Sequence, residues 1–279
     1  MINYVLETHN LSFSIFLFFK NMFVFYLVYL LYLLYNLTRY GVNGMKRIFK
    51  FIKGLFIFIL IILLITFSFV TFEGYKLYKD KTNEISIEEK VKKIRAEEDY
   101  VTYNDIPEDF VNALVSIEDR RYFKHNGIDV ISICRAVITD LREKSLVEGG
   151  STITQQLAKN IYFSREKKFS RKVAEVFVAF NLEKNYSKED ILELYINIVY
   201  FGDGHYGIKQ ASLGYFNKLP KDLTLSEITM LAGLPNAPSA YALSNKTELS
   251  TERQDMVIDA MVKNNYLSEE DAKRIKENN

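Results

Sequence analysis

Two apolar runs near the N-terminus precede a chain in which apolar residues recur at helical spacing. The first run extends roughly from Leu11 to Leu37 and is interrupted by Lys20 and Asn21, whereas the second, from Leu55 to Phe72, contains no charge. About 20 apolar residues are needed to cross a bilayer core, so the second run predicts a membrane span. Beyond Asp105, helical periodicities alternate with polar turns and strand-like alternation is scarce, which predicts a mainly α-helical domain.

These patterns divide the chain into four segments. Met45 opens the basic leader MKRIFKFIKG, so we interpret residues 45–72 as a leader and an uncleaved transmembrane anchor, and residues 1–44 as an upstream translation artefact. The alternative is that residues 1–44 are genuine and add a second span. Residues 73–104 are charged and weakly patterned, which predicts a linker, and residues 105–279 form the folded domain. Basic residues flank the span almost evenly and do not orient it.

A crowded polar segment, EDRRYFKHNG, begins at Glu118, where the first helix of the domain is expected to end. Asp105 as a cap and Pro107 in the first turn mark the start of that helix. A carboxylate at its far end meets the negative end of the helix dipole, and packing by Tyr122 and Phe123 would add desolvation. Both effects disfavour ionisation, so Glu118 is a candidate general base. The alternative is a solvated acid in a charged turn.

A second unusual segment is GGSTITQQ, from Gly149 to Gln156. Its two glycines free the backbone ahead of a helix, whose first N–H groups can bind an anion. The Ser, Thr and Gln side chains that follow offer neutral donors and acceptors suited to a sugar or a phosphate. The alternative is a capped loop with polar side chains.

A cationic run follows, in which Glu166 is the only acid within fourteen positions. The run predicts an anionic ligand, and its members are Lys159, Arg165, Lys167, Lys168, Arg171 and Lys172. Arg171 and Glu175 share one helical face at i,i+4 spacing. The alternative is an exposed basic face with an ordinary ion pair.

Composition excludes several classes of site. The 279 residues carry a formal net charge of only +1, which gives no support to general nucleic-acid binding. Cys134 is the single cysteine, so an internal disulfide and a cysteine metal cluster are excluded. Three histidines without an i,i+4 pair make no protein-built metal cage, so no metal ligands are predicted.

Four segments occur in a fixed order: EDRRYFKHNG, GGSTITQQLAKN, RKVAE and KEDILELYINIVYFGDGHYG. Together they resemble the motifs of the family 51 glycosyltransferases, the peptidoglycan transglycosylases, from about Asp105 to Arg253. One departure is Tyr122, which stands where the family pattern EDxxFxxHxG has phenylalanine. The resemblance implies a mainly α, lysozyme-like glycosyltransferase domain with a membrane-proximal lobe, preceded by a transmembrane helix.

The resemblance also implies a function. A monofunctional enzyme would polymerise lipid II into glycan strands in bacterial cell-wall synthesis, by inverting β-1,4 transfer with a polyprenyl pyrophosphate leaving group. Its partners would be lipid II, the growing strand, membrane lipid and other wall-synthesis proteins, with no nucleic acid. The expected location is the cell membrane, with a single-pass anchor and the catalytic domain on the extracytoplasmic side. The alternatives are a lysozyme-like hydrolase or lytic transglycosylase, and a catalytically silent scaffold.

Carried over residue by residue, the resemblance makes Glu118 the general base and Glu175 the second acid. It predicts substrate contacts from Ser151, Thr152, Gln155, Gln156, Lys159, Lys167, Arg171, Lys172 and Asn197. The residues expected to shape the motifs are Asp119, His125, Gly127, Gly149 and Gly150. Fixed cations suit an anionic pyrophosphate leaving group, and we place Lys159, Lys167 and Arg171 nearest to it. No cofactor is built in, although a divalent cation, Mg²⁺ or Mn²⁺, would be able to bridge the pyrophosphate.

Overall fold

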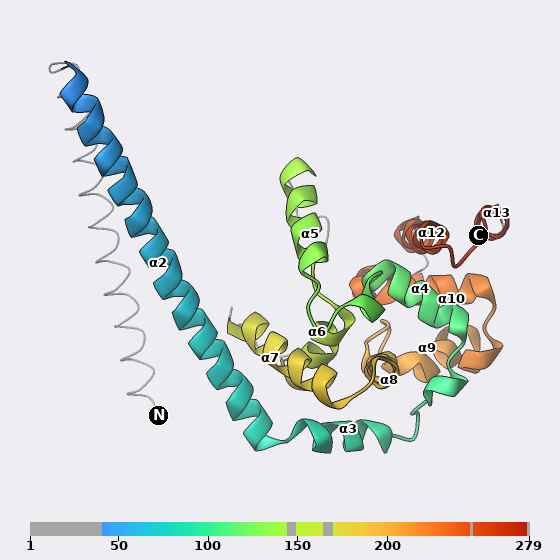
Figure 1. Ribbon diagram of the computed structural model, residues 1–279. Coiled ribbons are helices and arrows are strands. Elements are labelled where there is room, and N and C mark those ends of the chain that lie inside the picture. The colour runs from blue at the N-terminus through green and yellow to red at the C-terminus, as the bar shows by residue number, and fades with distance from the viewer. Residues whose placement is uncertain (1–40, 144–148, 164–169, 246–247, 278–279) are drawn as a thin grey trace. The chain divides into compact units, whose positions relative to one another are not determined.

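The computed structural model describes residues 41–143, 149–163, 170–245 and 248–277, and Figure 1 gives their course. The chain separates into two compact units, Met1–Phe69 and Val70–Asn279. Most of the first 44 residues lie outside the described part, and so does Lys167 of the predicted site.

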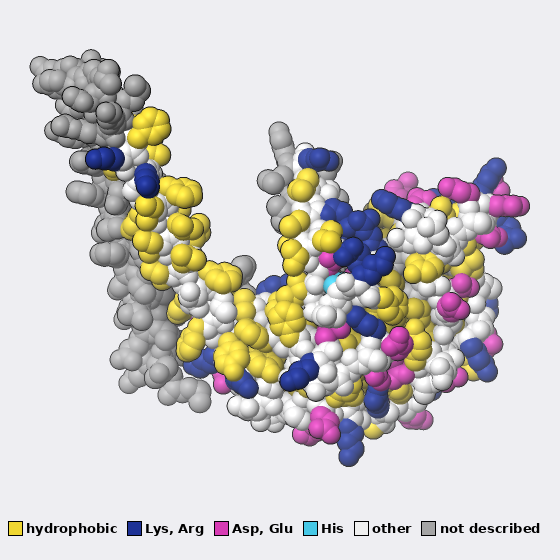
Figure 2. All heavy atoms as spheres, viewed as in Figure 1, with side chains coloured by type: hydrophobic (Ala, Val, Ile, Leu, Met, Phe, Trp, Pro, Cys, Tyr) yellow, Lys and Arg dark blue, Asp and Glu magenta, His cyan; other side chains and the backbone are white. Residues whose placement is uncertain are grey.

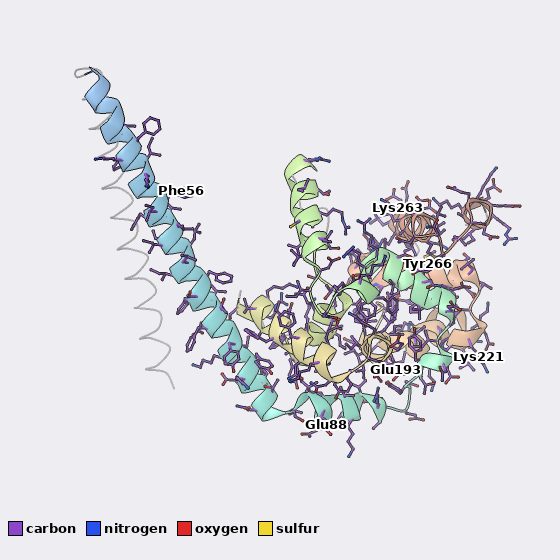
Figure 3. The ribbon with its side chains drawn as sticks, in the orientation of Figure 1. Phe56, Glu88, Glu193, Lys221, Lys263 and Tyr266 are labelled. Carbon is purple, nitrogen blue, oxygen red and sulfur yellow. The ribbon has the colours of Figure 1, made fainter. Side chains whose placement is uncertain are left out.

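A long helix, α2, runs from Gly41 to Glu84. Its stretch in the first unit carries outward-facing apolar side chains, among them Phe56 at 66% exposure and Phe67 at 70% (Figures 2 and 3). Within the described residues, the part of α2 from Ile48 to Glu84 is the one helix long and apolar enough to cross a membrane. An apolar surface of this kind is stable in a bilayer and costly in water, as expected for an anchor.

The segment predicted as a linker, residues 73–104, is instead part of the second unit. Its first residues continue α2, and helix α3 (Ile87–Arg95) follows after a cap by Ser86. Ile87 and Val91 are buried in the main core, because the charged residues of α3 leave an apolar stripe on one face. The high charge of this segment therefore marks an amphipathic surface helix, and the linker prediction is wrong.

The second unit is built from helices, which confirms the predicted mainly α fold. After a 3₁₀ turn at Tyr103–Asp105, the α-helices are α4 (Glu108–Glu118), α5 (Val130–Glu143), α6 (Ile153–Ala158), α7 (Ser170–Asn185), α8 (Lys188–Ile198), α9 (Gly207–Phe216), α10 (Leu225–Gly233), α11 (Pro238–Tyr241), α12 (Glu248–Lys263) and α13 (Glu269–Glu277). A π-helix, η3 (Lys159–Phe163), extends α6. Within the described residues the only β pairing is a single bridge between Tyr200 and Tyr206.

Local sequence signals fix several helix starts. Thr152, Ser187 and Thr224 each form a capping box with the residue three positions on. The start of α4 differs from the prediction, since Pro107 is itself the N-cap and Asp105 belongs to the preceding 3₁₀ turn.

In the core, α4 packs with α10 and α12, and α6 packs with α7 and α8 (Figure 1). The buried side chains of the two groups form one cluster. Phe110, Leu157, Leu192 and Leu231 are completely buried there. Each such side chain contributes about 1.5–3 kcal/mol through removal of apolar surface from water. This packing places the C-terminal end of α4 beside the N-terminal end of α6, and the unusual polar segments of the sequence occupy those two ends.

Candidate active site

Glu118 is the last residue of α4, as the sequence predicts, and its side chain is only 6% exposed. The Gln156 amide nitrogen donates to its Oε2 atom at 2.7 Å, and Nη2 of Arg253 lies 3.3 Å from Oε1. Burial raises the pKa of the Glu118 carboxyl, opposed by the Gln156 hydrogen bond and the Arg253 charge, while Asp119 adds to the rise. The interpretation as a solvated turn acid is therefore excluded.

The two aromatic residues expected to desolvate Glu118 differ in their surroundings. Tyr122 is buried, but its hydroxyl donates to the backbone carbonyl of Lys188, and Phe123 is 49% exposed. The groups that meet the carboxylate come instead from α6 and α12. The direction of the pKa shift is as predicted, and its first cause is burial.

Asp119 ties the two polar segments together. Its carboxylate accepts from Nε2 of His125 at 3.0 Å and from the backbone N–H of Ile153 at 3.1 Å. The Thr152 hydroxyl donates to the carbonyl of Gly127 at 2.7 Å. Gly127 has φ +83° and lies against the backbone of α7, so a side chain there would be strained. These bonds hold the start of α6 in a fixed position relative to Glu118.

The GGSTITQQ segment divides its polar side chains between local structure and the site. Thr152 and Gln155 form the capping box of α6, with the Gln155 Oε1 atom accepting from the Thr152 N–H at 3.0 Å. Ser151 accepts from Lys172 at 2.6 Å, and Gln156 turns toward Glu118. The capped-loop interpretation thus holds for two residues of the segment.

Glu175 lies on α7 with 1% of its side chain exposed, next to two cations. Nζ of Lys172 is 3.0 Å from Oε2, and Nε of Arg171 is 3.3 Å from Oε1. The Arg171 side chain is 31% exposed and that of Lys172 is 46% exposed, so both cations remain open to a ligand while a buried carboxylate fixes them from below. A basic, partly exposed surface of this kind suits a phosphate group.

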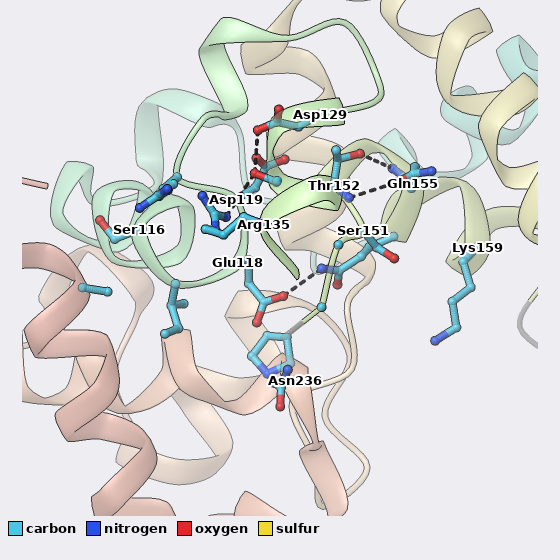
Figure 4. Close-up of a pocket in the computed structure, with 18 of the residues that line it drawn as sticks. Ser116, Glu118, Asp119, Asp129, Arg135, Ser151, Thr152, Gln155, Lys159 and Asn236 are labelled. Carbon is cyan, nitrogen blue, oxygen red and sulfur yellow. Dashed lines mark hydrogen bonds between the residues drawn. The ribbon is translucent and has the colours of Figure 1, made fainter. Parts of the chain in front are cut away.

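These groups line a single cavity of about 580 Å³ formed by residues of α4, α5, α6, α7 and α12 (Figure 4). Figure 2 shows Lys and Arg side chains gathered beside α5. The predicted residues that line it are Glu118, Asp119, Gly149, Gly150, Ser151, Thr152, Gln155, Gln156, Lys159, Arg171, Lys172 and Glu175. Two candidate carboxylates, one beside an arginine and one beside two cations, therefore face the same space.

A comparison with protein families gives a match to the family described as Transglycosylase over residues 86–262. The chain belongs to the transglycosylase family. Over 172 residues it is 48% identical to penicillin-binding protein 1F of Bacillus subtilis, covering 62% of this chain and 24% of that protein. Over 171 residues it is 43% identical to penicillin-binding protein 1A of Pseudomonas aeruginosa, covering 61% and 21%. The chain thus spans about a quarter of the length of these relatives.

Among solved structures, the transglycosylase chain is similar to penicillin-binding protein 1A from Haemophilus influenzae. The TM-score is 0.39 and the sequence identity 22%, over 63% of this chain and 17% of that one.

Asn197 is the one described member of the predicted transglycosylase substrate site that lies elsewhere. Its side-chain amide bonds both the N–H and the carbonyl of Val101, and it also donates to the carbonyl of Glu193. It does not line the cavity of Glu118. These three bonds fasten the segment before α4 to α8, and the substrate contact at Asn197 stays a prediction.

Arg253 is the site residue that the sequence analysis missed. It lies on α12, four and eight residues before the buried Val257 and Met261, and its Nε donates to the carbonyl of Gly233. The i, i+4, i+8 spacing places this cation on the same helical face as two apolar residues, which indicates that the face is buried. A buried charge needs a partner, so the spacing was a signal that could have identified Arg253. Other charged or amide side chains that line the cavity without having been predicted are Arg120, Asp129, Arg135, Asn236, Lys263 and Asn264.

Proposed function

We propose that this chain polymerises lipid II into peptidoglycan glycan strands, with Glu118 as the general base and Glu175 as the second acid. The observation that carries the proposal is that a buried carboxylate of raised pKa and a cationic surface line one cavity in a member of the transglycosylase family. Polymerisation needs a group that accepts a proton from the attacking hydroxyl and cations that stabilise the negative charge developing on the leaving group. The cavity offers the two in separate places.

The base is needed because a sugar hydroxyl is a weak nucleophile at neutral pH. Glu118 takes the proton of the attacking 4-hydroxyl group. The oxygen of that hydroxyl forms the bond to the anomeric carbon, and the bond from the anomeric carbon to the pyrophosphate oxygen breaks. The new linkage is β-1,4, and the configuration at the attacked carbon is inverted. A raised pKa brings the carboxylate closer to the acidity at which proton transfer is efficient.

The leaving group is polyprenyl pyrophosphate, which departs with the bonding electrons and needs no strong proton donor. Arg171, Lys172 and Lys159 supply positive charge where that negative charge develops. Glu175 holds Arg171 and Lys172 in place through the ion pairs at 3.3 and 3.0 Å. Ser151, bonded to Lys172, and Gln156 contribute polar contacts to sugar or phosphate.

A divalent cation, Mg²⁺ or Mn²⁺, belongs to the proposal as an ion carried by the pyrophosphate oxygens, which are usual ligands for such ions. Within the described residues no group of three His, Cys, Asp or Glu side chains could hold a metal, so the substrate would provide most of its ligands.

Anchoring follows from the substrate, because a polyprenyl tail that left the bilayer would expose a large apolar surface to water. The apolar stretch of α2 keeps the enzyme at that surface. We propose that the domain from Val70 onward lies on the extracytoplasmic side, where lipid II and the growing strand are its partners and other wall-synthesis proteins act beside it.

The experiment that tests this function offers the detergent-solubilised chain two labelled substrates, lipid II and purified glycan strands. We expect polymer from lipid II that a muramidase digests, and no shortening of the strands. Shortened strands without polymer would indicate a hydrolase or lytic transglycosylase, and no change in either substrate would indicate a scaffold.

A charge reversal sharpens the choice between synthesis and cleavage. Lys159→Glu should abolish nearly all polymerisation, because it places a negative charge where pyrophosphate binds. Lys184→Glu, on an exposed position of α7 outside the cavity, is the matched control and should retain activity. Equal activity of the two variants would contradict the proposed pyrophosphate site.

A further inference from the structure

Two hydrogen bonds in series connect α8 to the proposed base. The Tyr195 hydroxyl donates to Oε1 of Gln156 at 2.8 Å, and Nε2 of Gln156 donates to Oε2 of Glu118 at 2.7 Å; Figure 4 shows the second bond as a dashed line at Glu118. Tyr195 is completely buried in the core and does not line the cavity. Any effect of its hydroxyl on the reaction must therefore pass through Gln156.

We propose that Tyr195 is a positioning residue for the general base, whose hydroxyl fixes the Gln156 amide with its NH₂ group, and not its oxygen, toward Glu118. The inference rests on the proposed role of Glu118. It adds a residue that never touches substrate but determines the protonation of the group that does.

The side-chain amide of Gln156 can turn by 180° with little change in shape. Turned round, Gln156 would place its oxygen against a carboxylate oxygen, and both atoms would repel unless Glu118 carried a proton. The Tyr195 hydroxyl would then face an NH₂ group and would have lost the acceptor for its hydrogen in a fully buried position. The observed orientation satisfies both groups and favours the ionised form of Glu118, because a carboxylate is a stronger acceptor than a neutral carboxyl group.

Tyr195 is a dependable donor because burial, with the nearby Glu118 charge, raises the pKa of its hydroxyl well above the ordinary value. It keeps its hydrogen throughout the pH range in which a glutamate titrates. Gln156 has no charge, so Tyr195 affects Glu118 by fixing the orientation of the Gln156 amide and not by moving a charge.

The other groups that face Glu118 set the background against which this bond acts. Burial and Asp119 raise the pKa of Glu118, while Gln156 from α6 and Arg253 from α12 lower it. Across the cavity, α7 presents Arg171, Lys172 and Glu175, which are paired with one another. Four further cations, Arg120, Arg135, Lys159 and Lys263, line the remaining walls. Loss of the Gln156 bond therefore shifts the balance toward the protonated, inactive form.

The test compares Tyr195→Phe with Tyr122→Phe in the full chain. Both tyrosines are completely buried and both hydroxyls donate one bond, but that of Tyr122 goes to a backbone carbonyl of α8 and not to Gln156. We expect the acid limb of the polymerisation rate to move upward by about one pH unit in Tyr195→Phe, the size expected for one hydrogen bond to an ionised group. Tyr122→Phe should leave the limb where it is, and a shift of equal size in both variants would overturn the proposal.

Gln156→Leu shows whether Tyr195 acts through the amide. It should move the limb at least as far as Tyr195→Phe, and the double variant should move it no further than Gln156→Leu alone. Additive shifts of the acid limb would overturn the proposal that Tyr195 acts on Glu118 through Gln156, which we call the relay. Gln156→Leu also serves if Tyr195→Phe does not fold, because it removes the same bond while leaving the tyrosine packed, and an unmoved limb would then contradict the inference.

A readout without turnover separates this inference from the proposed function. Infrared difference spectra of the carboxyl band against pH, with Glu118→Gln as the reference, follow the protonation of Glu118 directly. An upward shift in Tyr195→Phe supports the relay even if no polymer is ever made, in which case the proposed function alone fails. Identical titrations of Glu118 in wild type and Tyr195→Phe would overturn the relay even if polymer is made.

Discussion

Replacing Arg253 by methionine should destabilise the protein more at pH 7 than at pH 5. The side chain is 12% exposed, its Nη2 faces Glu118 at 3.3 Å, and its Nε donates to the Gly233 carbonyl at 3.1 Å. Methionine keeps much of the volume but removes the charge and both contacts. A buried carboxylate that loses its counter-charge can take up a proton, and this protonation limits the loss of stability.

That proton sets the size of the effect. The ordinary pKa of the carboxyl is 4.5, so holding Glu118 neutral costs at most about 3.4 kcal/mol at pH 7 and about 0.7 kcal/mol at pH 5. The bond to Gly233 adds about 1 kcal/mol that does not depend on pH. The sign is that of an acid whose folded pKa rises: stability is favoured below the unfolded pKa and is lost as pH increases through the folded one. We expect a loss of about 2–4 kcal/mol at pH 7 and about 1–2 kcal/mol at pH 5.

The assay is urea unfolding of the detergent-solubilised chain at both pH values, followed by circular dichroism. Arg274→Met is the matched control, because that arginine is 71% exposed and pairs with Asp271 on the surface, so its loss should cost less than about 0.5 kcal/mol at either pH. A loss of stability in Arg253→Met that is equal at pH 5 and pH 7 would contradict this prediction, since it would show that Glu118 does not respond to this charge.

Three further predictions follow from local geometry. Gly207→Ala should lower the free energy of unfolding in urea by more than about 3 kcal/mol, because φ is +77° and a Cβ atom would lie 2.4 Å from a backbone carbonyl oxygen. Gly204→Ala is the control: φ is +86°, but a Cβ atom there would meet open space, so the loss should be only about 1–2 kcal/mol. Equal losses in the two variants would contradict this prediction. Thr152→Val should cost about 1–2 kcal/mol through loss of the α6 cap and the bond to the loop after α4, and no change in stability would show that the capping box is unimportant. The wild-type polymerisation rate should fall on acidification with a midpoint above 4.5, because burial raises the pKa of Glu118 and the base must be ionised; a midpoint at or below 4.5 would argue against Glu118 as the base.

The sequence was sufficient where the signal is local. The end of α4 at Glu118 follows from an apolar periodicity that stops there, and the start of α6 follows from paired glycines ahead of a Thr and a Gln at capping spacing. The membrane anchor follows from an uncharged apolar run. Each of these features depends on neighbours within a few positions, which is the range over which backbone propensity and capping act.

Contacts between distant segments were not predictable in this way. Arg253 meets Glu118 across 135 positions of sequence, and only the packing of α12 over α4 brings them together. Asn197 lies in a motif-like segment, but its amide faces the backbone of Val101, since α8 presents that face to the chain before α4. The direction in which a polar side chain points depends on tertiary packing, and a motif does not encode it by itself.

The most direct test of the whole account is to incubate labelled lipid II with the wild-type protein and with Glu118→Gln, and to separate the products on a gel. Glutamine keeps the shape of the side chain and can still bond Gln156, but it cannot accept a proton. We predict muramidase-sensitive polymer from the wild type and none from Glu118→Gln, with both proteins unfolding at similar urea concentrations. Polymer from Glu118→Gln at the wild-type rate would contradict the central claim that Glu118 is the base.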